Sequence, residues 1–208
     1  HRDLHSFPTR RSSDLTCSER VIFGAEKLGD CLSEEGYKVI FSTDKKTEPN
    51  QFSVIIGEAA DPEFNSLVPG TVNELNTPDH KEGFSIRSAG KSIVISGYDG
   101  SGVLYGCIGL IHKIEEEGRL PRNINISDYP KMIMRGTCIG LQKTVYLPGR
   151  RIYEYPYTPE NFPWFYDKEL WIKYLDMMVE NRYNSLYLWN GHPRSEERRV
   201  GKECRSRW

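Results

Sequence analysis

One stretch near the C-terminal end limits the possible folds of this chain more than any other: DKELWIKYLDMMVENRYNSLYLWNGHP, residues 167–193. It begins with Asp167, a residue type favoured at helix N-caps. Apolar side chains then recur at three- and four-residue steps, at Leu170, Trp171, Tyr174, Leu175 and Met178. This spacing predicts an amphipathic helix. Residues 185–189 follow as a short apolar run that favours a strand buried on both faces. A helix that leads into a buried strand is half of a β/α repeat, and in barrels made of such repeats ligands bind at the carboxyl ends of the strands.

The composition of the chain indicates a globular protein. Its 208 residues are 38% hydrophobic and 12% aromatic, which suits one sizeable domain or one small domain with part of another. No apolar run approaches the roughly 20 residues needed to cross a bilayer, so we expect no membrane span. Residues 16–193 hold 19 basic and 24 acidic residues, a net charge of −5, and we expect no nucleic-acid partner.

The two ends of the chain differ from the rest. Residues 1–15 (HRDLHSFPTRRSSDL) and 194–208 (RSEERRVGKECRSRW) are rich in Arg and Ser and show neither helical nor strand periodicity. As basic arms they could bind nucleic acid, but both resemble translated sequencing-adapter read-through. We interpret them as artefactual tails outside the fold, which makes the chain a fragment at both ends. The localisation is therefore open, and a periplasmic or secreted parent is compatible with the sequence.

The first half of the chain predicts a two-layer α+β domain over residues 16–118. Ser18 is a suitable N-cap for a helix that extends to about residue 35, and Gly36 is a natural stop after its last turn. The expected strands are residues 37–41, 52–56, 83–87 and 92–96, the last two joined as a hairpin, and the expected second helix is residues 101–117. Residues 58–80 are expected to form a long polar connection. We expect both helices on one face of a small sheet.

Four glycines accompany the second of these helices: Gly100, Gly102, Gly106 and Gly109. Glycines at a helix start can cradle a phosphate, but this spacing matches neither nucleotide-binding fingerprint. We therefore predict that they let the helix pack closely on the sheet, and we expect no cofactor.

The cysteines indicate no metal site. Cys17, Cys31, Cys107 and Cys138 are scattered along the chain, with no CxxC pair and no histidine at zinc-ligand spacing. Buried thiols are one interpretation, and a structural disulfide is the other.

A second domain is expected over residues 131–193. It follows a proline-containing linker, residues 119–130, in which two isoleucines could add an edge strand. Residues 132–140 predict its first strand. Residues 141–166 are rich in aromatic residues and proline, and so long an excursion after a barrel strand is usually functional. With the helix and strand described above, these elements predict the truncated start of a (β/α)₈ TIM barrel: its first strand, helix and second strand.

Two segments resemble known glycoside hydrolases. The first domain, with its strand pair, its hairpin and the sequence DGSGVLYG at residues 99–106, resembles the α+β domain that precedes the catalytic barrel in bacterial β-N-acetylhexosaminidases and α-glucuronidases. Residues 128–136 (DYPKMIMRG) are similar to the Asp-x-Pro-Arg-Phe-x-x-Arg-Gly entry to the barrel of glycoside hydrolase family 20. The resemblance implies that Arg135, the arginine of the Arg-Gly pair, binds sugar hydroxyls. The alternative for Arg135 is an ion pair that ties the strand end to a neighbour.

The sequence departs from family 20 after this motif. Where hexosaminidases have Asp-x-Ser-Arg, this chain has CIGL at residues 138–141, and where they have a His-Trp-His-Leu type of strand it has LYLWNGHP at residues 186–193. The resemblance therefore supports a glycosidase relative rather than a plain hexosaminidase.

Three residues at the predicted carboxyl end of the second barrel strand are further candidates for substrate binding: Trp189, Asn190 and His192. Trp189 could stack on a sugar face or fill the mouth of the barrel. His192 could contact the substrate or cap a loop.

Glycoside hydrolysis needs two carboxyl groups that flank the glycosidic bond, or one acid assisted by the acetamido group of the substrate. The resemblance places these acids on later barrel strands, so the catalytic residues are unknown and expected downstream. The helix carboxylates Asp167, Glu169, Asp176 and Glu180 are expected to be surface charges. We interpret the chain as an inactive fragment of a glycoside hydrolase, β-N-acetylhexosaminidase-like or α-glucuronidase-like, that acts on oligo- or polysaccharides. The alternative is a non-catalytic carbohydrate-binding or accessory module, and the oligomeric state is open.

Overall fold

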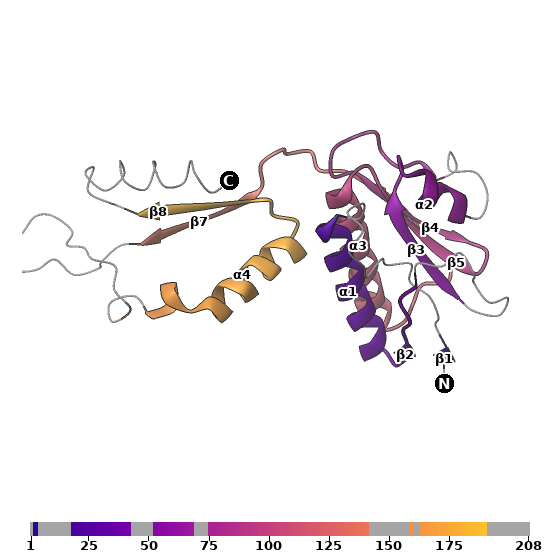
Figure 1. The fold of residues 1–208 in the computed structure, drawn as a ribbon, viewed down its shortest axis with the longest axis horizontal. Coiled ribbons are helices and arrows are strands. Elements are labelled where there is room, and N and C mark those ends of the chain that lie inside the picture. Colours follow the sequence, from indigo (N-terminus) through magenta and orange to yellow (C-terminus); the bar gives the residue numbers. More distant parts are fainter. Residues whose placement is uncertain are drawn as a thin grey trace, which may run out of the picture. The chain divides into compact units, whose positions relative to one another are not determined.

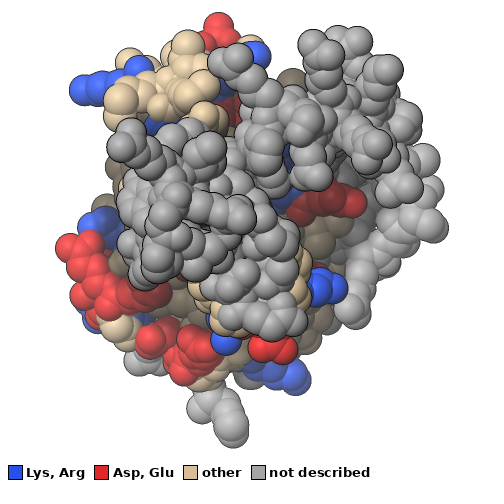
Figure 2. All heavy atoms as spheres, turned by 90° about the vertical axis from the view of Figure 1, so that its left-hand side faces the viewer, with Lys and Arg blue, Asp and Glu red and all other residues tan. Residues whose placement is uncertain are grey.

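The chain divides into two compact units, His1–Lys131 and Met132–Trp208, which are described separately below (Figure 1). The computed structural model describes residues 2–3, 18–42, 52–68, 75–141, 159 and 163–190. Among these described residues, no helix is both long enough and apolar enough to cross a membrane. Acidic and basic side chains both appear on the described part of the face shown in Figure 2.

The first unit is built on a mixed four-stranded sheet. Its strands are β3 (Ser53–Glu58), β4 (Phe84–Ala89), β5 (Ser92–Gly97) and β6 (Asn125–Asp128), in the order β3-β5-β4-β6. β3 pairs with β5 in parallel, whereas β4 is antiparallel to both β5 and β6. The β4–β5 hairpin is confirmed, and its turn contains Gly90 at φ +62°, a conformation that suits glycine. The edge strand is also confirmed, so residues of the expected linker complete the sheet.

Two long helices cover one face of this sheet (Figure 1). They are α1 (Glu19–Glu34), which Ser18 caps by accepting from the N–H of Arg20, and α3 (Gly100–Glu117), which ends at Gly118 in the left-handed region. The strand register aligns Ile56, Ile95 and Ile86 across β3, β5 and β4, and all three are buried. This apolar row packs against α3, and it forms the core of the unit.

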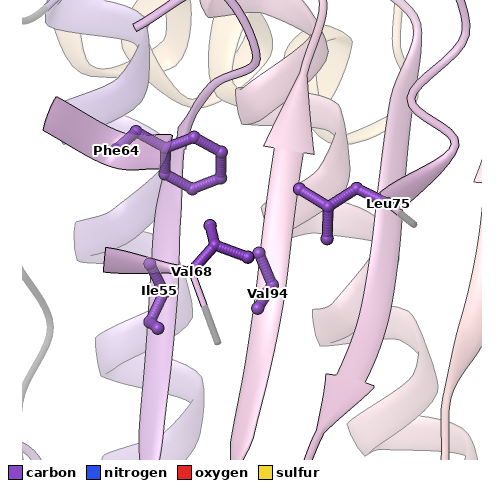
Figure 3. Packing of buried hydrophobic residues seen from close by; sticks show 5 residues of the cluster. All are labelled: Ile55, Phe64, Val68, Leu75 and Val94. Atoms are coloured by element: carbon purple, nitrogen blue, oxygen red, sulfur yellow. The ribbon is translucent and has the colours of Figure 1, made fainter. Parts of the chain in front are cut away.

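A short helix, α2 (Pro62–Leu67), covers the other face. Figure 3 shows Phe64 of α2 close to Ile55 and Val94 on neighbouring strands, with Val68 and Leu75 beside them. Asp61 caps α2 by accepting from the N–H of Glu63 at 2.8 Å. The expectation that the two predicted helices share one face is therefore confirmed, whereas the connection at residues 58–80 contains a helix that was not predicted. A six-residue helix is too short to show a 3.6-residue periodicity, and only its Asp-Pro start signals it.

The predicted strand at residues 37–41 is much shorter in the structure. β2 comprises Tyr37–Lys38 and pairs in parallel with β1 (Arg2–Asp3), outside the four-stranded sheet. Ile40 and Phe41 lie beyond β2 and are exposed. Apolar residues alone do not fix the length of a strand, which depends on the cross-strand neighbours that the fold supplies. The interpretation of residues 1–15 and 194–208 as artefactual tails stays a prediction, since all but Arg2 and Asp3 lie outside the described residues.

The second unit is a β/α/β arrangement. β7 (Gly136–Leu141) is followed by a 3₁₀ turn η2 (Pro163–Tyr166), the helix α4 (Lys168–Glu180) and β8 (Ser185–Asn190), which pairs with β7 in parallel. The predicted N-cap of α4 is confirmed, because an oxygen of Asp167 accepts from the N–H groups of Glu169 and Leu170. This arrangement is the one expected at the start of a barrel. That the unit belongs to a barrel stays a prediction.

Two details of the second unit differ from expectation. β7 begins at Gly136 instead of residue 132, and the preceding Met132, Ile133 and Met134 are exposed, Ile133 by 90%. β8 is not buried on both faces, since Tyr187 is 61% exposed. The described sheet of this unit has two strands, and two strands with one helix cannot cover both faces.

The cysteines should differ in their reactivity toward a thiol reagent. Cys107 is buried and Cys31 half-buried, and burial raises their pKa to about 12 and about 11, whereas Cys138 is exposed and thus not the buried thiol we expected. The thiolate is the reactive form, so at pH 8 few Cys107 or Cys31 side chains will be ionised. Among these three cysteines, which are the ones in the described part of the chain, we predict that iodoacetamide alkylates Cys138 first, with Cys31 and Cys107 reacting as the pH is raised toward 11. Mass spectrometry of tryptic peptides over time checks this order, and early modification of Cys107 would contradict it.

Candidate functional site

The carboxyl ends of β7 and β8 lie side by side. The register pairs Gly140 with Trp189 and Leu141 with Asn190 in neighbouring parallel strands. Two of the predicted site residues, Trp189 and Asn190, therefore occupy the last backbone positions of β8, where parallel sheets bind ligands. His192 lies outside the described residues. This edge of the sheet is the candidate site.

The helix α4 runs antiparallel to the two strands (Figure 1). The hydroxyls of Thr137, near the start of β7, and Tyr174 are hydrogen-bonded at 2.6 Å, and the Thr137 oxygen is 3.8 Å from the sulfur of Met178. Since the later part of α4 lies near the start of β7, the beginning of α4 and the preceding η2 lie toward the carboxyl ends of the strands. The candidate site and η2 are thus at the same end of this unit.

Four aromatic residues at this end form what we call the aromatic platform: Trp164, Phe165, Tyr166 and Trp171. The ring centroids of Trp164 and Trp171 are 6.2 Å apart, and Phe165 makes edge-to-face contacts with Trp171 at 5.8 Å and with Tyr166 at 5.5 Å. The indole N–H of Trp171 donates to the carbonyl oxygen of Phe165 at 2.7 Å. These residues were not among the predicted site residues, although the run of aromatic residues before the N-cap Asp167 is a signal for them.

Arg135 lies at the opposite end of the strands from Trp189 and Asn190. It directly precedes β7, and its guanidinium donates to the carbonyl oxygens of Arg182 at 2.8 Å and Met132 at 2.7 Å. The structure therefore does not bring Arg135 together with Trp189 and Asn190. The sugar-binding role that the resemblance implies for it stays a prediction.

The backbone of Arg135 is also held. Its N–H donates to the side-chain oxygen of Asn184 at 2.9 Å, and its carbonyl oxygen accepts from the N–H groups of Asn184 and Ser185. These bonds join the segment before β7 to the segment before β8. We define this arrangement as the Arg135–Asn184 clamp.

The carboxylates of α4 and its cap differ in exposure. Asp167 is the helix cap, Glu169 and Glu180 are exposed, and Asp176 is half-buried. In the first unit, burial raises the pKa of Glu58, and the neighbouring carboxylates Asp99 and Asp61 raise it further. Asp61 and Asp99 both cap helices, which explains their positions without catalysis. Among the described residues, no group of three or more potential ligands is placed to hold a metal ion.

Comparison with known proteins identified solved structures of similar fold, whereas no known family description matches the sequence. A GH138 enzyme targeting pectin rhamnogalacturonan II is 45% identical, with a TM-score of 0.70 over 92% of this chain and 24% of its own length. A family GH115 4-O-methyl-α-glucuronidase with specificity for decorated arabinogalactans is 13% identical, with a TM-score of 0.60 over 91% of this chain and 25% of its own. CpGH84D is 16% identical, with a TM-score of 0.53 over 66% of this chain and 22% of its own length.

These structural neighbours are glycoside hydrolases, so the chain has a glycoside hydrolase-like fold. It spans about a quarter of the length of the GH138 and GH115 structures. The likeness extends over both units, because 92% of this chain cannot be covered by either one alone.

Proposed function

We propose that this chain is part of a glycoside hydrolase that acts on a pectic polysaccharide. The observation that carries the proposal is the 45% identity to a GH138 enzyme over 92% of this chain. An identity of that size over both units is much more specific than the likeness in fold to the GH115 and GH84 structures, at 13% and 16% identity. The choice of pectin rests on the substrate of that one neighbour.

In this proposal the β7-α4-β8 unit supplies the first two strands of a (β/α)₈ barrel. Trp189 and Asn190 end β8 at the edge where such barrels bind their substrates, and His192 follows two residues later. These three residues would contact the sugar. The pair of carboxyl groups that cleaves the glycosidic bond would come from strands that lie downstream, so the 208-residue chain is inactive by itself.

The experiment is hydrolysis by the longer protein that contains this chain. The reading frame beyond residue 193 is recovered by resequencing, and the purified product is incubated with rhamnogalacturonan II oligosaccharides, aryl β-N-acetylhexosaminides and glucuronosyl oligosaccharides. We expect sugar release from the first substrate only, and none from any substrate with the 208-residue chain. Sugar release from one of the other two substrates would instead mean that the enzyme acts on a hexosaminide or a glucuronoside. Binding of pectic oligosaccharides without hydrolysis would favour a non-catalytic carbohydrate-binding module.

A further inference from the structure

We infer that the aromatic platform on η2 and the start of α4 is a stacking site for a sugar ring, with Tyr166 as the ring that meets the ligand. This inference rests on the proposed function for the kind of ligand. It adds a binding position that lies on the helix side of the candidate site rather than on the strands themselves.

Exposure distinguishes Tyr166 from the other rings of the platform. Trp164, Phe165 and Trp171 are half-buried, as expected of rings that pack against each other, whereas Tyr166 is 51% exposed. A large aromatic side chain gains free energy by burial, so a ring held at the surface beside packed rings suits a surface that a ligand covers.

The platform is held in place by contacts other than those of Tyr166. The N–H of Trp171 fixes the carbonyl of Phe165, one residue before Tyr166, and the ring of Phe165 meets that of Tyr166 at 87°. The backbone N–H of Asp167, one residue after Tyr166, donates to the carbonyl oxygen of Trp164 at 3.2 Å. The backbone on both sides of Tyr166 is therefore fixed before a ligand arrives, which lowers the conformational entropy lost on binding.

The chemistry of the site favours a sugar ring. One face of a pyranose presents several C–H groups with partial positive charge, which match the negative face of an aromatic ring, while the hydroxyls at the rim stay in water. Tyr166 lies at the same end of the unit as Trp189 and Asn190, so a chain of several sugars could reach both positions. A stacked sugar on Tyr166 would then be a neighbour of the sugar bound at the strand ends.

The test is an NMR titration of the 208-residue chain with the pectic oligosaccharides described above. Tyr166→Leu keeps apolar volume for packing but removes the aromatic face, and Tyr166→Phe keeps the face. We expect Tyr166→Leu to raise the dissociation constant about tenfold, equivalent to about 1.4 kcal/mol, and Tyr166→Phe to leave it nearly unchanged. Tyr98→Leu is the matched control, because Tyr98 is 42% exposed in the first unit and should not contribute.

The outcomes separate this inference from the proposed function. Equal binding by the wild-type chain and Tyr166→Leu would overturn the stacking site, even where the longer protein hydrolyses pectic oligosaccharides. A tenfold loss in Tyr166→Leu with no hydrolysis by the longer protein would support the site and contradict the enzyme. Absence of binding by the wild-type chain would overturn the site, whereas hydrolysis by the longer protein would still stand as the test of function.

Discussion

Replacing Gly102 with alanine should destabilise the first unit by about 3 kcal/mol, at the upper end of what overpacking costs. A Cβ atom at this position would clash with the carbonyl oxygen of Gly83. That carbonyl cannot retreat easily, because it accepts from the N–H of Tyr98 at 2.8 Å. The loss would far outweigh the gain of about 1 kcal/mol that alanine offers over glycine within a helix.

Gly109 on the same helix is the matched control. A Cβ there would approach the terminal carbon of Ile86 at 3.3 Å, and a side-chain end can shift where a backbone carbonyl cannot. We expect Gly109→Ala to change the free energy of unfolding by less than about 1 kcal/mol in either direction. Urea unfolding followed by circular dichroism measures both variants. Similar values for the two would mean that close approach at Gly102 is unimportant.

The glycine prediction shows what the sequence can settle about the first unit. The spacing of the four glycines excluded a nucleotide loop, and the structure places Gly106 against Ile95 and Gly102 against the backbone of Gly83, as close packing requires. Helix α1 was also predictable, because its N-cap, its apolar stripe and its glycine stop agree with each other. Local signals that agree are sufficient for elements of this kind.

The features that were predicted wrongly or missed share a physical cause: they depend on contacts between residues that are distant in the sequence. Residues 132–134 are as apolar as a strand, but the pairing of β7 with β8 begins only at Gly136, which lies opposite Ser185. The sequence cannot show that pairing. Tyr166 and Trp171 were separated by the expected boundary between excursion and helix, and their joint platform depends on a turn whose bonds span six residues, from Trp171 to Phe165. Neither periodicity nor propensity records such contacts.

Replacing Arg135 with alanine should loosen the second unit before it affects any sugar contact. The substitution removes two charge-assisted hydrogen bonds, to the carbonyl oxygens of Met132 and Arg182, each worth about 1.5–3 kcal/mol when buried and less at this half-buried position. We expect a loss of about 2 kcal/mol in the local stability of the Arg135–Asn184 clamp. Native-state hydrogen exchange measures this directly at the amides of Asn184 and Ser185, which donate to the carbonyl of Arg135.

Two variants make this measurement specific for the guanidinium. Arg135→Lys keeps the charge but cannot donate to two carbonyls in fixed directions, so it should lose much of the same protection. Arg122→Ala removes an exposed arginine in the first unit and should leave the exchange of Asn184 and Ser185 unchanged. The sugar-binding role of Arg135 would be favoured by a different pair of results: full protection of these amides in Arg135→Ala, and a loss of two or more powers of ten in kcat/KM of the longer protein. Such a loss is expected when hydrogen bonds to the transition state are removed. The position of Arg135 at the amino end of β7, away from the edge where Trp189 and Asn190 lie, predicts the loss of protection instead.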